Sequence, residues 1–158
     1  MKKLLLYSFV SFALIQLSGC NEDINENSVV DKNLNAAILS DLALNIPQTV
    51  YGELGARTSS LYDKVVALET ATNDINLVAA QQAWRDARKT WEQSEAHLFG
   101  PVSTDKIDPR IDTWPINFTD LDAQLASGNS FTDTYIDNLE DALKGFHPVE
   151  YLLFGETG

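Results

Sequence analysis

Residues 145–155 read GFHPVEYLLFG and combine a helix start with a histidine and a carboxylate. Gly145 suits the left-handed conformation that ends a helix, and Pro148 suits the first turn of a new one. In that new helix His147 and Glu150 stand three residues apart on one face, within reach of a single ion. A histidine three residues before a glutamate is also common where the histidine only caps a helix or packs in a core. The pair alone therefore does not decide between a metal ligand and a structural histidine.

Apolar spacing predicts helices over most of the chain that precedes this stretch. The first covers residues 33 to about 70, and Pro47 is expected to kink it or split it in two. The second covers residues 75 to 98 and carries one buried stripe, formed by Leu77, Ala80, Trp84, Ala87, Trp91 and Leu98. Shorter helices are predicted over residues 118–126 and 133–144.

Residues 100–117, GPVSTDKIDPRIDTWPIN, contain three prolines and interrupt the helical pattern. Their tryptophan and isoleucines indicate an irregular segment that packs onto the domain. No stretch of the chain alternates as a strand does. The sequence therefore predicts an all-α domain, an up-and-down helical bundle with one long irregular crossing loop.

Three charged residues fall on or beside the tryptophan face of the second helix. Arg88 follows Trp84 by four residues, Glu95 follows Trp91 by four, and Glu92 lies between them. Burying a charge is costly unless the charge is paired or coordinated, so these side chains are expected to meet partners. A structural ion pair and a set of metal ligands both satisfy that requirement.

The N-terminus predicts export and a lipid anchor. Two lysines precede an apolar run that is short for a membrane span, and residues 17–20 read LSGC, which resembles the lipobox of bacterial lipoproteins. Cys20 is the only cysteine, and lipidation gives this lone thiol a role. The alternative is an ordinary secretory signal with a chance cysteine.

The predicted organisation follows from that signal. Residues 1–19 form the signal peptide, residues 20–31 a flexible acidic tether from lipidated Cys20, and residues 32–158 the helical domain. The expected location is the bacterial cell envelope, anchored in the outer membrane and facing the periplasm. A net charge of −12 argues against nucleic acid as a partner and is compatible with cations.

Three stretches together resemble the imelysin family. They are residues 84–101 with the pattern WxxxRxxWxxxE followed by FGP, residues 108–115 (DPRIDTWP), and residues 145–150 with the signature GxHxxE. The resemblance covers residues 33–155 and is to the N-terminal half of an imelysin-like two-bundle domain. It implies exported, often lipid-anchored proteins linked to iron or other metals, with the site in a cleft near the junction of two halves. The chain is therefore expected to be either a truncated product that lacks the other half, or a half-domain that pairs with a second half-domain or a second copy of the chain.

The hypothesis for the site is a metal ion held by a histidine and several carboxylates. One imidazole with carboxylates suits iron, and zinc or manganese as alternatives. The candidate ligands are His147, Glu150, Glu95, Asp112 and Glu92, with Arg88 and Asp108 as supporting residues.

Two other functions remain open. A metal-dependent peptidase, the activity that gave the family its name, would use Glu150 or Glu92 as the base, although the chain contains no HExxH motif. A non-catalytic helical interaction module would use residues 145–155 only as a helix junction, and an exposed apolar patch would then make it dimerise.

Overall fold

The computed structural model describes residues 32–155, and every regular element among them is a helix. The predicted signal peptide, Cys20 and the tether lie outside the described residues. The chain divides into two compact units after Ala37, and the architecture below belongs to the second. Within residues 32–155 no helix is both long and apolar enough to span a membrane.

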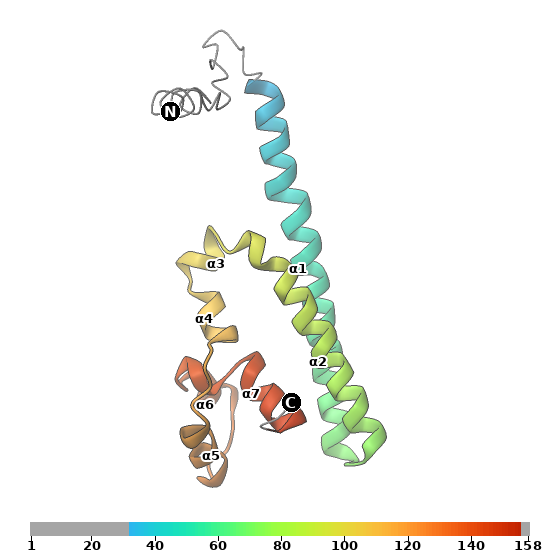
Figure 1. Cartoon of the computed structure of the whole chain (residues 1–158), viewed down its shortest axis with the longest axis vertical. Helices are drawn as coiled ribbons and strands as arrows, with labels where there is room; N and C mark the ends of the chain where they lie inside the picture. The colour runs from blue at the N-terminus through green and yellow to red at the C-terminus, as the bar shows by residue number, and fades with distance from the viewer. Residues whose placement is uncertain (1–31, 156–158) are drawn as a thin grey trace, which may run out of the picture. The chain divides into compact units, whose positions relative to one another are not determined.

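Two long helices are followed by short ones (Figure 1). In chain order they are α1 (Lys32–Thr70), α2 (Asp74–Ser94), η1 (Glu95–His97), α3 (Pro101–Thr104), α4 (Ile107–Asp112), α5 (Phe118–Ala126), α6 (Asp133–Asp137), η2 (Asp141–Leu143) and α7 (Phe146–Phe154). The all-α prediction is confirmed, and the helix predicted at residues 118–126 is found with those bounds.

The main core lies between α2 and α7. The predicted stripe of α2 is buried through Ala80, Trp84, Ala87 and Trp91, and it packs on Phe146 and Leu153 of α7. Side chains of α2 also donate hydrogen bonds to the backbone of α7. Trp84 Nε1 reaches the Phe146 carbonyl at 3.0 Å, and Gln81 Nε2 reaches the Leu153 carbonyl at 2.8 Å. These bonds fix the position of α7 along α2.

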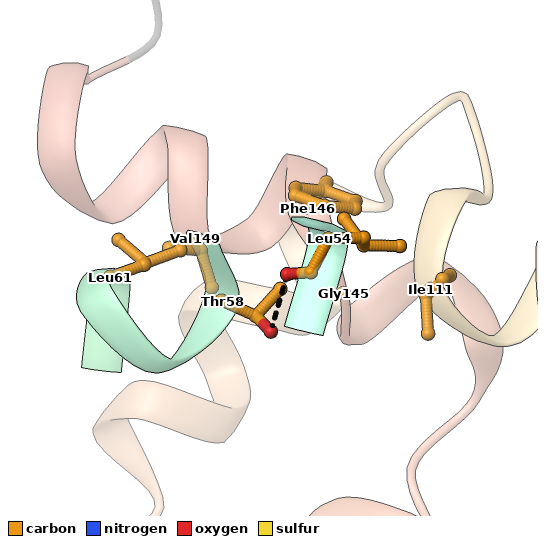
Figure 2. A pocket seen from close by; sticks show the side chains of 7 residues that line it. All are labelled: Leu54, Thr58, Leu61, Ile111, Gly145, Phe146 and Val149. Carbon is orange, nitrogen blue, oxygen red and sulfur yellow. Dashed lines mark hydrogen bonds between the residues drawn. The ribbon is translucent and has the colours of Figure 1, made fainter. Parts of the chain in front are cut away.

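The first helix packs on this core from its C-terminal part. Tyr51, Leu54, Leu61 and Leu68 contact the α2–α7 cluster. Further toward the N-terminus of the second unit, large apolar side chains of α1 are exposed, namely Ile38, Leu39, Leu42, Leu44 and Ile46. An apolar hollow separates Leu54, Thr58 and Leu61 of α1 from Ile111 of α4 and the start of α7 (Figure 2).

A second, smaller cluster holds α5 and η2 against α7. Ile116, Leu121 and Leu143 are buried in it, and Phe118, Leu139 and Tyr151 pack around them. The Tyr151 hydroxyl donates to Asp122 Oδ1 at 3.0 Å, and its ring meets Phe118 edge-on. α7 is therefore held on one side by α2 and on another by α5 and η2.

The structure differs from three of the predicted helices. Pro47 was expected to kink the first helix or split it in two, and the split is not found, because α1 continues through Pro47 as one helix. Proline removes one backbone donor, and because Ala43 at the start of that turn is exposed, water can satisfy the carbonyl that loses its partner. The predicted helix 75–98 ends as an α-helix at Ser94 and continues only as the short 3₁₀ helix η1.

The predicted helix over residues 133–144 also breaks. α6 ends at Asp137, and Lys144 Nζ donates to the carbonyls of Asp137 and Leu139 at 3.0 and 2.9 Å. The ammonium takes the place of the backbone amides that would have continued the helix.

The segment expected to be irregular contains α3 and α4. Pro101 occupies the first turn of α3, where its missing N–H costs nothing. Lys106, at φ +52°, separates the two helices, and α4 then carries Asp112 on its last turn. This second short helix brings the carboxylate to the start of α7.

Candidate functional site

Gly145 allows α7 to start close against α4. Its backbone has φ +92° and ψ −157°, a region that essentially only glycine adopts. A Cβ at this position would lie 2.3 Å from the Ile111 carbonyl oxygen. Because Asp112 follows Ile111, the absence of a side chain at Gly145 is what lets α4 present Asp112 to the first turn of α7.

His147 stands between two carboxylates. Its Nδ1 lies 3.1 Å from Glu150 Oε2, and its Nε2 lies 3.1 Å from Asp112 Oδ1. The side chains of His147 and Asp112 are 15% and 8% exposed, whereas that of Glu150 is 34% exposed. The exposed ring of Trp114 tilts over the imidazole at 4.8 Å between centroids. The predicted i, i+3 pair is therefore present, and the structure adds Asp112 on the opposite nitrogen.

The two contacts of His147 require more than a neutral ring can supply. A neutral imidazole carries one N–H, so it donates to only one of the two carboxylates. Its other nitrogen then faces an oxygen that is also an acceptor. Either a second proton or a cation between nitrogen and carboxylate makes both contacts favourable.

Asp112 is the most heavily partnered carboxylate of the site. Trp91 Nε1 donates to its Oδ2 at 2.7 Å, and Arg88 Nη1 donates to its Oδ1, the oxygen that also faces His147. Arg88 pairs in addition with Glu92. The carboxylate is thus oriented by α2 and α7 together, and its position does not depend on α4 alone.

Asp112 also belongs to a group of three carboxylates. Glu92, Glu95 and Asp112 each offer an oxygen within 4.8 Å of the others, and the two glutamates are exposed. The predicted ligands therefore fall into two sets that share Asp112. One set contains His147 and Glu150, and the other contains Glu92 and Glu95.

Asp108, the remaining predicted carboxylate, lies one turn before Asp112 on α4. It borders a different hollow, beside Leu98, Val102 and Lys106. The structure thus brings Asp112 and not Asp108 to His147. The other histidine, His97, ends η1 with its ring 6.3 Å from that of Phe99, outside both sets.

Two tryptophans belong to the site although sequence reasoning treated them only as packing residues. Trp91 follows Arg88 by three residues and so shares its helix face, a spacing that signals a common partner. Trp114 follows Asp112 by two residues, and no sequence signal indicates that its ring covers His147.

The donor set fits a metal ion. The 3.1 Å between His147 Nε2 and Asp112 Oδ1 is compatible with two ligands of one ion at about 2.0–2.2 Å each. A histidine ligand commonly donates its other N–H to a carboxylate, the position that Glu150 occupies here. The class defined by fold and site is thus a small helical domain with a histidine–carboxylate cluster between three of its helices.

Comparison with known proteins places this domain in a family. The sequence profile of Imelysin (peptidase M75) matches residues 47–158, and the chain belongs to that family. The chain is 37% identical over 107 residues to the "Iron-regulated protein A" of Synechococcus elongatus, covering 68% of this chain and 28% of that protein.

Two solved structures share the fold. An imelysin peptidase from Bacteroides ovatus aligns with a TM-score of 0.57 and 30% identity, covering 66% of this chain and 32% of the other. A protein described as an iron-regulated protein A precursor, from Parabacteroides distasonis, aligns with a TM-score of 0.68 and 25% identity, covering 77% and 34%. The chain therefore spans about a third or less of the length of these relatives.

Proposed function

We propose that this chain binds a metal ion, preferentially iron, at His147 and Asp112. The observation that carries the proposal is the imidazole held between two carboxylate oxygens at 3.1 Å each, an arrangement that a neutral ring alone does not satisfy. Two relatives are named iron-regulated proteins, and this link to iron is the reason to prefer it among the metals that suit the site. One imidazole with carboxylates suits iron, zinc or manganese better than copper(I).

Each neighbouring residue has a defined task in this proposal. Glu150 accepts the proton of Nδ1 and so leaves the Nε2 lone pair free for the ion. Trp91 holds the second oxygen of Asp112, which directs Oδ1 toward His147. Glu92 and Glu95 extend the negative charge to the surface, where they can attract a cation or complete its coordination.

A titration with a matched histidine control tests the site. Thermal melts of the purified chain are recorded with and without ferrous, ferric, zinc and manganese ions, for wild type, His147→Ala and His97→Ala. An ion at about 100 times its Kd should stabilise the fold by roughly 2.7 kcal/mol. The stabilisation is expected in wild type and His97→Ala and absent in His147→Ala. A wild-type melt that responds to none of these ions would overturn the proposal.

A metal-dependent peptidase is the second candidate, because a structural relative is described as an imelysin peptidase. The base would be Glu150 or Glu92, whose side chains are partly exposed and pair with His147 and Arg88 of the proposed site. Cleavage of an unfolded protein that stops with chelator and with Glu150→Gln would support this activity. Metal binding without any cleavage would reject it.

The cellular setting follows the same proposal. We infer an exported protein anchored through lipidated Cys20 in the outer membrane, with the helical domain in the periplasm. Labelled palmitate should enter the chain in bacteria that express it, and Cys20→Ser should abolish the label. Equal labelling of both forms would contradict the anchor.

The apolar side chains along α1 support a partner for this domain, either a second half-domain or a second copy of the chain. Light scattering over a dilution series distinguishes them. A dimer that dissociates on dilution indicates a second copy, and a monomer at all concentrations rejects self-association.

A further inference from the structure

Arg88 already supplies a positive charge to the acidic side of the site. Its guanidinium pairs with both Asp112 and Glu92, two of the three carboxylates that lie within 4.8 Å of one another. The side chain is 20% exposed and its Cζ lies 5.5 Å from the centre of the Phe146 ring. The negative charge of these carboxylates is therefore partly compensated by a side chain of the protein itself.

The guanidinium and the proposed ion compete for one atom. Arg88 Nη1 and His147 Nε2 both contact Asp112 Oδ1, while Oδ2 is occupied by Trp91. An ion held by His147 and Asp112 would lie close to the guanidinium, because Arg88 and His147 contact the same oxygen of Asp112. Two neighbouring positive charges in a partly buried setting would repel strongly.

Glu92 is a second ion-pair partner for the guanidinium. It pairs with Arg88, and its side chain is 45% exposed. Arg88 can therefore leave Asp112 and remain paired with Glu92 near the surface, without an unpaired charge being left in the core.

We propose that Arg88 is an internal counter-cation of the site, which holds Asp112 and Glu92 in the metal-free chain and leaves Asp112 Oδ1 when an ion binds between Asp112 and His147. This inference rests on the proposed metal-binding function. Arg88 is a positioning residue that lowers the affinity of the site for cations, so that weakly held ions do not replace it.

The test compares two arginines of the same helix. Arg88→Met removes the internal cation and keeps an unbranched chain against Phe146. Arg85→Met removes the same charge from α2 at a position over the Phe154 ring, outside the carboxylate group. Isothermal titration of both variants and wild type with manganese and ferrous ions measures the Kd directly.

The expected result is a tighter Kd for Arg88→Met, by about tenfold or more, with a much smaller change in Arg85→Met. A merely structural arginine would give weaker binding when it is lost. Weaker or unchanged binding in Arg88→Met, with wild-type binding that still requires His147, overturns this inference and leaves the proposed function standing. Equal tightening in both variants also overturns it. Binding by none of the three proteins overturns both.

A second measurement uses the wild-type chain and therefore does not depend on whether Arg88→Met folds. The guanidinium N–H signals of Arg88 are followed by nitrogen-15 NMR and assigned by their loss in Arg88→Lys. Added ion should change the signals of Arg88 and leave those of Arg85 unmoved. Unchanged Arg88 signals, while the His147 ring signals shift, would show that the guanidinium does not move and would overturn the proposal.

Discussion

Replacing Gly145 by alanine tests how the fold places the site. The backbone at Gly145 lies in a region that costs other residues about 1–3 kcal/mol. The added Cβ would also stand 2.3 Å from the Ile111 carbonyl oxygen, so the backbone of α4 has to shift. Forced shifts of this kind in a packed interior cost about 1–3 kcal/mol more. The expected total is a loss of about 2–6 kcal/mol in the free energy of unfolding.

Gly155→Ala is the matched control. Gly155 has φ +80° and ψ −175°, close to the values at Gly145, but a Cβ there would meet no atom within 4 Å. This control therefore carries the backbone cost alone. The difference between the two variants isolates the contact with Ile111, and it should amount to about 1–3 kcal/mol.

Urea unfolding followed by helical circular dichroism measures both losses. Gly145→Ala should also lose the stabilisation by metal that the proposed site predicts, because the shift of Ile111 would move Asp112 away from His147. Equal losses in the two variants, with the metal response retained in both, would refute the reasoning that Gly145 sets the distance between α4 and α7.

Three further substitutions test individual contacts, the first two by urea unfolding and the third by thermal melts with and without metal ions. Trp84→Phe removes the hydrogen bond to the Phe146 carbonyl and should cost about 1–3 kcal/mol, whereas a loss near zero would show that the bond contributes nothing net. Asn73→Ala removes the side chain that caps the first turn of α2 and should cost about 1 kcal/mol, with an unchanged midpoint as the contrary result. Asp112→Asn keeps the shape but removes the charge shared by the site, so it should abolish the metal response, and a response that survives would exclude Asp112 as a ligand.

The sequence predicted best where one element decides its own structure. The stripe of α2 is legible because Ala80, Trp84, Ala87 and Trp91 repeat at helical spacing, and all of them are buried. The break after α6 was missed because the backbone leaves the helical conformation at Glu140, and the Lys144 ammonium then folds back onto the carbonyls of Asp137 and Leu139. Apolar periodicity does not report such contacts between a side chain and the backbone.

At the site too, contacts within one helix could be predicted from the sequence, whereas contacts between helices could not. The contact of His147 with Glu150 follows from residues three apart on one helix, so the sequence predicts it. The choice of Asp112 over Asp108, and of Nε2 over Nδ1 as the nitrogen it faces, depends on how α4 approaches α7. Gly145 was identified as a helix terminator, yet its larger effect is to admit the Ile111 carbonyl.

Asp112 explains why the site forms only in the folded chain. Its partners come from separate elements, with Arg88 and Trp91 on α2 and His147 on α7. None of these contacts is local, so the packing of α2, α4 and α7 has to form before the carboxylate is oriented. An ion at the proposed site would stabilise that packing, because the site exists only in the folded state. In the absence of an ion the nearby carboxylates repel one another, and the guanidinium of Arg88 supplies the compensating charge. The proposed exchange of the guanidinium for an ion would therefore link metal binding to the stability of the α2–α7 core.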